Sequence, residues 1–156
     1  MEQHDFFMRE AIELANENIL NGGGPFGAVI VLNGEIVGKG SNQVTNHNDP
    51  TAHAEVLAIR DACRKLKRFD LSDCELYTSC EPCPMCMGAI YWARIPKVFF
   101  GNTRKEAASI GFDDDFIYQE LSLPIGQRSI LMKPLLSKEA SKTFKAWDLK
   151  VDKKVY

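Results

Sequence analysis

The sequence lacks both a long apolar run and a strong excess of charge. None of its 156 residues lies in a stretch that approaches 18 consecutive apolar residues, so no membrane-spanning helix is expected. The first ten residues, MEQHDFFMRE, are acidic and polar where a signal peptide would carry positive charge and then apolar residues. The net charge of −2 disfavours a large nucleic-acid footprint, which usually needs a basic face. We therefore expect a cytoplasmic protein that binds neither membranes nor nucleic acid.

Cysteine is present, but the sequence lacks the pattern of a disulfide framework. The five cysteines are an odd number, and Cys80, Cys83 and Cys86 crowd into seven residues beside prolines. In a chain for which no export signal is expected, such a run is typical of metal binding in a reducing compartment.

Hydrophobic periodicity and turn signals predict a single domain over residues 1–156, built from alternating helices and strands. The predicted helices cover 5–20, 51–68, 84–94 and 138–149, and the predicted strands cover 26–32, 35–40, 74–79, 97–101 and 129–136. Residues 138–156 form a C-terminal helix and tail. This order predicts an α/β protein with helices on both faces of its sheet.

Two short motifs contain the residues most suited to chemistry, His53-Ala54-Glu55 and Pro82-Cys83-Pro84-Met85-Cys86. Cys83 and Cys86 are three apart at the start of a predicted helix, so both sulfurs lie on one face where the helix dipole favours thiolates. His53 begins an earlier predicted helix. If the two helix starts face each other, one imidazole and two thiolates form a zinc site that keeps one position open for water.

Glu55 lies two residues beyond His53 and is the candidate catalytic residue. A carboxylate beside the ion can carry a proton from water to a substrate nitrogen. The combined pattern H-x-E…P-C-x-x-C is the signature of zinc deaminases that act on nucleobases. Hydrolytic removal of an amino group is therefore the leading hypothesis.

Cys80 leaves an alternative open. A site that used Cys80, Cys83, Cys86 and His53 would be closed, and closed zinc sites are structural. The chain would then be a zinc-stabilised binding module without turnover. We favour Cys80 as a bystander, because Pro82 separates it from the helix and it ends a predicted strand.

The chain resembles the cytidine-deaminase-like zinc enzymes at these residues. The matching blocks are Gly27-Ala28-Val29, Asn42, Asp49-Pro50-Thr51-Ala52-His53-Ala54-Glu55 and Glu81-Pro82-Cys83-Pro84-Met85-Cys86, in order over residues 1–110. The resemblance implies a three-layer α-β-α sandwich around a five-stranded mixed sheet. It also implies one zinc ion held by His53, Cys83 and Cys86, with Glu55 as the proton shuttle.

Two branches of this superfamily compete. The tRNA adenosine deaminases share the Asp-Pro-Thr-Ala-His-Ala-Glu block, but they typically have His-Ser-Arg where this chain reads Ile90-Tyr91-Trp92-Ala93-Arg94. The bacterial guanine deaminases are similar over nearly the full length, for example in Gly24-Pro25-Phe26-Gly27 and Gly111-Phe112-Asp113-Asp114. That likeness implies conversion of guanine to xanthine and ammonia. Adenosine deamination in tRNA, and deamination of another small aminated heterocycle, remain alternatives.

The same resemblance implies a set of substrate contacts. Phe26 and Trp92 would be aromatic walls around a purine, Asn42 would hydrogen-bond the base, and Asp114 would accept hydrogen bonds from the guanine edge. Each residue also has an ordinary structural interpretation. Phe26 and Trp92 would simply pack, Asn42 would order its loop, and Asp114 would be solvated or cap a helix.

The resemblance finally implies a homodimer. In the family, the C-terminal segment crosses to a partner subunit and closes the neighbouring active site. Residues 138–156 would then be exchanged, with Trp147 and Tyr156 at the interface and Tyr156 at the partner's substrate. A frayed terminal tyrosine is the alternative.

Overall fold

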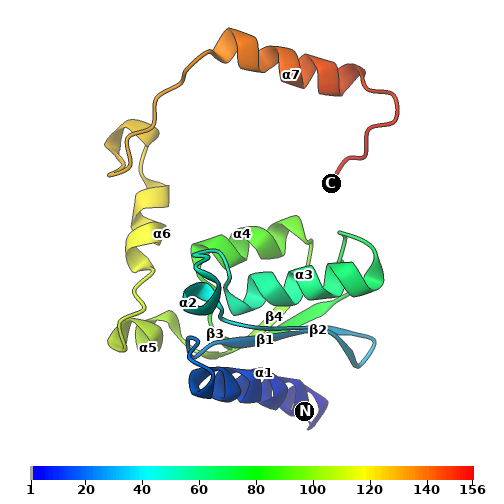
Figure 1. Ribbon diagram of the computed structural model, residues 1–156, viewed down its shortest axis with the longest axis vertical. Coiled ribbons are helices and arrows are strands. Elements are labelled where there is room, and N and C mark those ends of the chain that lie inside the picture. Colours follow the sequence, from blue (N-terminus) through cyan, green and yellow to red (C-terminus); the bar gives the residue numbers. More distant parts are fainter. Residues whose placement is uncertain (1) are drawn as a thin grey trace. The chain divides into compact units, whose positions relative to one another are not determined.

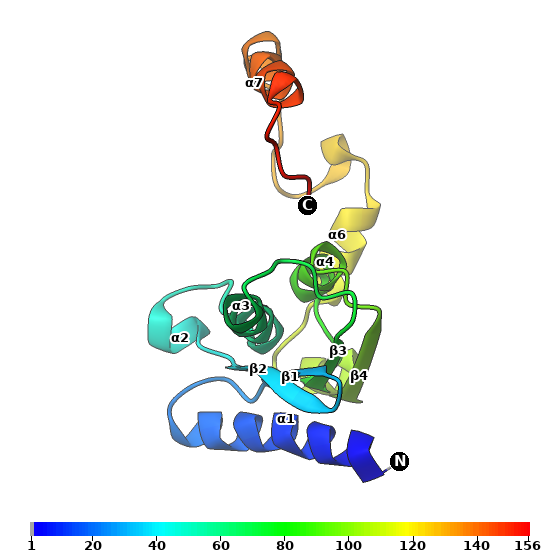
Figure 2. The ribbon, with the colours of Figure 1, turned by 90° about the vertical axis from the view of Figure 1, so that its right-hand side faces the viewer.

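The computed structural model describes residues 2–156 and separates into two compact units, one that runs to Asp115 and one over Phe116–Tyr156 (Figures 1 and 2). Each unit is described by itself. The predicted single domain over residues 1–156 remains a prediction.

The first unit is built on a mixed sheet of four strands. The strands are β1 (Gly27–Leu32), β2 (Glu35–Ser41), β3 (Glu75–Cys80) and β4 (Lys97–Asn102), in the order β2-β1-β3-β4. β1 pairs antiparallel with β2 and β3, whereas β3 and β4 are parallel. Asn33 and Gly34 join β1 to β2 with φ of 51° and 82°. Asn-Gly is the preferred pair for a tight hairpin turn that needs positive φ at both positions.

Helices cover both faces of this sheet, which confirms the expected α/β class. Helix α1 (Glu2–Leu20) lies on one face, and α3 (Ala54–Leu66) and α4 (Pro84–Trp92) lie on the other (Figure 2). Each face has its own apolar core. Phe7 of α1 packs with Val29 and Tyr77 on one face, while Leu76 packs with Ile90 on the other. Two short helices, α2 (Val44–His47) and α5 (Arg104–Ser109), follow β2 and β4.

Helix α3 packs directly on the backbone of β2. A Cβ placed on Gly40 would lie 2.2 Å from the carbonyl oxygen of Ala54, and one on Gly38 would lie 2.4 Å from that of Ala58. Glycine on the strand and alanine on the helix therefore permit a close approach that a larger residue would prevent. This contact sets the height of α3 above the sheet at the end of the helix where the candidate site lies.

The C-terminal unit contains α6 (Asp115–Ser122, beginning at the last residue of the first unit), a 3-10 turn at Ile125–Gln127 and α7 (Ser137–Leu149). The expected fifth strand over 129–136 is wrong, because these residues are irregular and the sheet within residues 2–156 has four strands. A strand exists only where a neighbour completes its hydrogen-bond ladder, and Pro134 has no amide hydrogen to offer one. None of the helices over residues 2–156 has the length and apolar character that crossing a bilayer demands.

Candidate active site and metal centre

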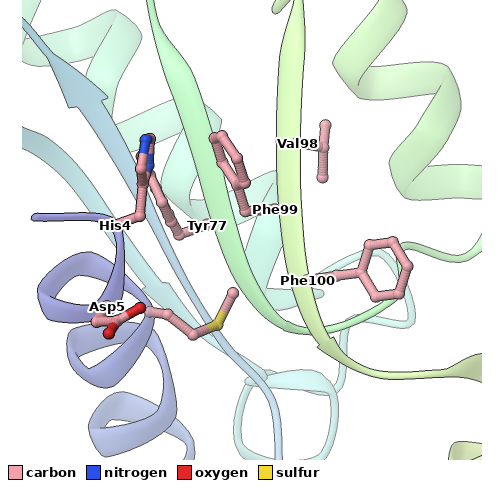
Figure 3. A pocket seen from close by; sticks show the side chains of 7 residues that line it. His4, Asp5, Tyr77, Val98, Phe99 and Phe100 are labelled. Atoms are coloured by element: carbon pink, nitrogen blue, oxygen red, sulfur yellow. The ribbon is translucent and has the colours of Figure 1, made fainter. Parts of the chain in front are cut away.

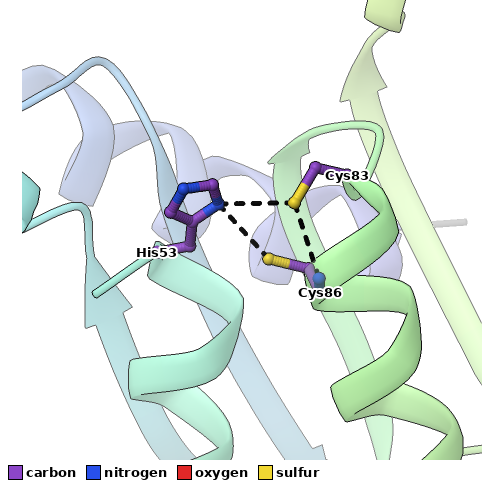
Figure 4. Close-up of side chains that lie close together, drawn as sticks. All are labelled: His53, Cys83 and Cys86. Atoms are coloured by element: carbon purple, nitrogen blue, oxygen red, sulfur yellow. Dashed lines mark hydrogen bonds between the residues drawn. The ribbon is translucent and has the colours of Figure 1, made fainter. Parts of the chain in front are cut away.

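The structure brings His53, Cys83 and Cys86 together at the starts of α3 and α4 (Figure 4). The Nδ1 atom of His53 lies 3.5 Å from the sulfur of Cys83 and 3.5 Å from the sulfur of Cys86. The ligand atoms of all three residues lie within 4.8 Å of one another. The two motifs, 30 residues apart in the sequence, therefore form one cluster.

Local backbone structure explains this convergence. His53 is the N-cap of α3 and Cys83 is the N-cap of α4, both with extended backbones, and Pro84 follows at the first helical position. The backbone N–H of Cys86 donates to the Cys83 sulfur at 3.5 Å. Unpaired N–H groups at a helix start favour negative charge. The hydrogen bonds from Cys86 and His53 hold the pKa of Cys83 well below that of an ordinary thiol.

The cluster fits a zinc ion. With Zn–S of about 2.3 Å and Zn–N of about 2.0–2.1 Å, a tetrahedral site has S···N edges of about 3.6 Å. The two observed S···N distances of 3.5 Å agree with this edge. Among residues 2–156, these three are the side chains that group as metal ligands, so the donor set is that of a zinc site with one position left open.

Glu55 lies beside the cluster in the first turn of α3 and is only 6% exposed. Its Oε1 accepts a hydrogen bond of 3.3 Å from the hydroxyl of Thr78, and its Oε2 lies 3.3 Å from the thiol of Cys86. Burial raises the pKa of the Glu55 carboxyl above its usual range. A buried carboxylate with increased proton affinity is suited to take up and release a proton.

Cys80 lies outside the cluster, as favoured from the sequence. It ends β3, and its sulfur contacts the backbone carbonyl of Thr103 at 3.9 Å. Burial raises the pKa of its thiol to about 11, which disfavours the thiolate that metals require. The adjacent Glu81 accepts a hydrogen bond of 3.0 Å from the backbone N–H of Arg104 at the start of α5. Both residues thus have structural partners of their own.

Four of the five candidate substrate residues lie in the same unit as the cluster, and three of them, Phe26, Asn42 and Asp114, lie on loops. Asn42 is buried after β2, and its backbone N–H donates to the carbonyl of Phe26 at 3.0 Å. The ring of Phe26 meets that of Phe112 edge to face, with centroids 4.9 Å apart. Asp114 is half-buried. The hydrogen bond with Cys83 raises the pKa of His53, and the charge of Asp114 adds to that increase.

The family follows from a comparison of this site and its surroundings with known proteins. Residues 1–102 match the family model of the cytidine and deoxycytidylate deaminase zinc-binding region. The chain belongs to this deaminase family. The match covers every residue of the metal cluster and Glu55, so zinc is the metal of this deaminase.

Several relatives resemble this deaminase over different lengths. It is 52% identical to guanine deaminase from Bacillus subtilis over 98% of this chain and 99% of that protein. The X-ray structure of guanine deaminase from Bacillus subtilis has a TM-score of 0.95 and covers 98% of both chains. The tRNA-specific adenosine deaminase of Aquifex aeolicus is 43% identical over 68% of this chain and 70% of that protein. A structure of guanine deaminase from Nitrosomonas europaea has 36% identity and a TM-score of 0.66, over 69% of this chain and 63% of that one.

Trp92 of this deaminase lies at the far end of α4 from the cluster. Trp92 is 68% exposed and ends α4, about 12 Å along the helix from Pro84 at 1.5 Å per residue. Tyr156 belongs to the C-terminal unit and is 67% exposed. The role predicted for Trp92, an aromatic wall around the purine, and the role predicted for Tyr156, at the partner's substrate, both remain predictions.

Sequence patterns missed two features of the deaminase. One is Thr78, whose contact with Glu55 joins residues 23 apart. The other is a pocket of about 400 Å³ beneath α1, lined by His4, Asp5, Met8, Tyr77, Val98, Phe99 and Phe100 (Figure 3). It shares no residue with the metal cluster. The Nδ1 atom of His4 lies 2.6 Å from the hydroxyl of Tyr77, which donates to Glu75 at 2.9 Å, so these side chains fasten α1 to the sheet.

Proposed function

We propose that the chain is a zinc-dependent deaminase that hydrolyses guanine to xanthine and ammonia. The observation that carries this proposal is a buried glutamate beside three zinc ligands, in a chain similar to guanine deaminase from Bacillus subtilis over its full length. A site with three protein ligands retains a position for water, as catalytic zinc sites do. The closed four-ligand alternative is not favoured, because Cys80 has its own contact elsewhere.

His53, Cys83 and Cys86 would hold the ion, which supplies a Lewis acid that makes water nucleophilic near neutral pH. Glu55 takes a proton from the attacking water and delivers it to the ring nitrogen next to C2. Oxygen bonds to C2, and Glu55 then transfers the proton of this new hydroxyl group to the exocyclic amino group. The bond from C2 to the exocyclic nitrogen breaks, ammonia leaves, and the oxygen on C2 becomes the carbonyl of xanthine. Such a shuttle typically accelerates a reaction by roughly 10² to 10⁴-fold.

Recognition of the base would combine stacking with hydrogen bonds. Phe26 would offer its aromatic face to the base. Its carbonyl accepts the hydrogen bond from the backbone N–H of Asn42, so the two proposed contacts are neighbours. The Oδ1 atom of Asn42 accepts from the N–H of Val44 at 3.2 Å, so its amide hydrogens are the groups that would donate to the base. Asp114 would accept from the N–H groups at N1 and the 2-amino group of guanine, in charge-assisted hydrogen bonds.

A homodimer with exchanged C-terminal segments would complete this site. No residue of Phe116–Tyr156 is buried. Even the large apolar side chains of Leu131, Leu135 and Phe144 are 78%, 83% and 81% exposed. A segment this apolar is covered in a stable protein. Exchange of residues 138–156 would bury it, place Trp147 at the interface and bring Tyr156 of one copy to the partner's active site. A cytoplasmic location agrees with the five free cysteines.

The main rival is deamination of adenosine in tRNA, because tRNA-specific adenosine deaminases are also similar to this chain. Those similarities cover about two thirds of the chain, whereas that to guanine deaminase covers 98%. The net charge of −2 also disfavours an RNA-binding surface.

Ammonia release tests the proposal directly. The zinc-loaded protein would be assayed with guanine, guanosine, adenine, cytosine and a tRNA anticodon stem-loop. We expect turnover with guanine well above that with every other substrate. Faster turnover of the stem-loop, with a steep salt dependence, would favour the tRNA enzyme. Release from no substrate by a folded, zinc-loaded protein would leave the binding module as the function.

A further inference from the structure

The side chain of Asn18 connects the two loops that carry the proposed base contacts. Asn18 lies in the last turn of α1 and is 3% exposed. Its Nδ2 donates to the carbonyls of Gly24 at 2.8 Å and Asn42 at 2.7 Å. Its Oδ1 accepts from Nε2 of Gln43 at 2.7 Å. Both the donor and the acceptor side of this one amide are therefore used, with good geometry, between the loop after α1 and the loop after β2.

The backbone of Asn18 adds to this connection. Its carbonyl accepts from the N–H groups of Asn21 at 3.1 Å and Gly23 at 2.9 Å. A Cβ on Gly23 would lie 2.3 Å from Nδ2 of Asn18, so the glycine loop packs directly against the asparagine side chain. The loop that leads to Phe26 is consequently held by both the backbone and the side chain of Asn18.

These contacts fix the backbone of Asn42 from two sides. Its carbonyl is held by Asn18 and its N–H by the carbonyl of Phe26. The next residue, Gln43, donates its own N–H to the carbonyl of Ala52 at 2.9 Å. Ala52 directly precedes the metal ligand His53. The hydrogen bonds of Asn18 thus link α1, the two loops and the start of the metal site in one continuous chain.

We propose that Asn18 is a positioning residue for base binding, which holds Asn42 and the loop to Phe26 in the arrangement that accepts a purine. This inference rests on the proposed function, because it takes Asn42 and Phe26 as base contacts. The role needs the amide itself, since its nitrogen donates to the buried carbonyl of Asn42 and also to the part-buried carbonyl of Gly24, which has a second donor in the N–H of Phe26. An unpaired buried carbonyl is costly, so the loops move when the donor is lost.

The substitution Asn18→Asp tests this role, because it keeps the size of the side chain but removes the donor. The matched control is Asn46→Asp, an exposed residue whose Nδ2 donates to Asn21 and Gln43 of the same loops. At a temperature below the unfolding transition, we expect Asn18→Asp to raise KM for guanine roughly tenfold, the equivalent of about one lost hydrogen bond. We expect a smaller change in kcat, unchanged zinc content, and a KM within about twofold of wild type for Asn46→Asp.

A double-mutant cycle separates positioning from simple stability. If Asn18 acts through Asn42, adding Asn18→Asp to Asn42→Ala changes KM much less than it does in the wild-type background. Should Asn18→Asp fail to fold, Gln43→Ala keeps both hydrogen bonds donated by Asn18 and removes the one it accepts, together with the contacts of Gln43 to Ser41 and Asn46. It should raise KM by a smaller factor.

Several outcomes would overturn the inference. One is a folded Asn18→Asp variant with wild-type KM, and another is an effect on KM that adds fully to that of Asn42→Ala. If Asn18→Asp does not fold, a wild-type KM for Gln43→Ala would also overturn the inference. In each case the proposed function stands as long as the wild-type protein turns over guanine. A wild-type protein that does not turn over guanine would overturn both the proposed function and the role of Asn18.

Discussion

The close contact between β2 and α3 predicts that Gly40→Ala damages the metal site without touching a ligand. The added Cβ would lie 2.2 Å from the carbonyl oxygen of Ala54 and 2.6 Å from the nitrogen of Ala58, whereas ordinary contacts of a Cβ are 3.4–4 Å. Both neighbours are helix backbone, which cannot rotate away as a side chain would. The first turn of α3 must therefore move outward by about 1 Å, because packed interiors have no free volume to absorb the methyl group.

This shift displaces the residues that matter for chemistry. His53 and Glu55 flank Ala54, while Cys83 and Cys86 lie on a different helix and do not move with them. Metal–ligand distances tolerate only about 0.2 Å, and a misplacement of 1 Å at an active site is enough to cost about 10²-fold in rate. We expect Gly40→Ala to lose most of its zinc and to reduce kcat/KM for guanine by about 10²-fold or more.

Zinc content by atomic emission and ammonia release from guanine measure the two effects, and circular dichroism reports whether the variant is folded. The control is Gly88→Ala within α4, where an added Cβ meets nothing within 4 Å. Alanine is the better helix former, so this variant should keep its zinc and gain up to about 1 kcal/mol of stability. A Gly40→Ala protein with one zinc per chain and activity within about twofold of wild type would refute the reasoning.

Four further substitutions test the assignments around the metal. Glu55→Gln keeps the shape but cannot carry a proton, so it should bind zinc normally and lose roughly 10² to 10⁴-fold in kcat; near wild-type turnover would remove Glu55 from the mechanism. Cys83→Ser should lose zinc while Cys80→Ser keeps most of it, and comparable losses in metal analysis would show that Cys80 is a ligand. Asp114→Asn removes a charge-assisted acceptor and should raise KM for guanine by about tenfold or more; an unchanged KM would assign the carboxylate to the loop alone.

The metal cluster could be predicted from the sequence because its geometry is local. Cys83 and Cys86 share the first turn of one helix, and His53 and Glu55 share the start of another. Spacing within a helical turn fixes which side chains lie on the same face. Spacing alone could not show that the two helix starts meet. The family resemblance implied this, and the structure shows it.

Predictions of one helix start and of contacts with distant partners were less successful. The helix expected from Thr51 begins at Ala54, because the N–H and hydroxyl of Thr51 donate to the carboxylate of Asp49 at 2.8 and 2.7 Å and so form a turn of their own. Asn18 gave no signal, since a single asparagine late in an amphipathic helix does not reveal hydrogen bonds to residues 24 positions away. The strand expected over 129–136 had the right composition but no neighbouring strand, and composition cannot provide a neighbour.

The extent of each similarity indicates where substrate choice resides. The family match ends at residue 102, and the tRNA-specific adenosine deaminases of Aquifex aeolicus and Bacillus subtilis match 68% and 65% of the chain. Guanine deaminase from Bacillus subtilis matches 98% of it. The metal ligands and Glu55 lie inside the shared part, so relatives with different named substrates have this part in common. What distinguishes them is then expected in residues that do not hold the metal, which include the proposed base contacts Phe26, Asn42 and Asp114. Zinc binding and base selection are therefore expected to be separable by substitution. Changes to the metal ligands or Glu55 should abolish turnover of every base, whereas changes to the proposed base contacts Phe26, Asn42 and Asp114 should alter which base is accepted.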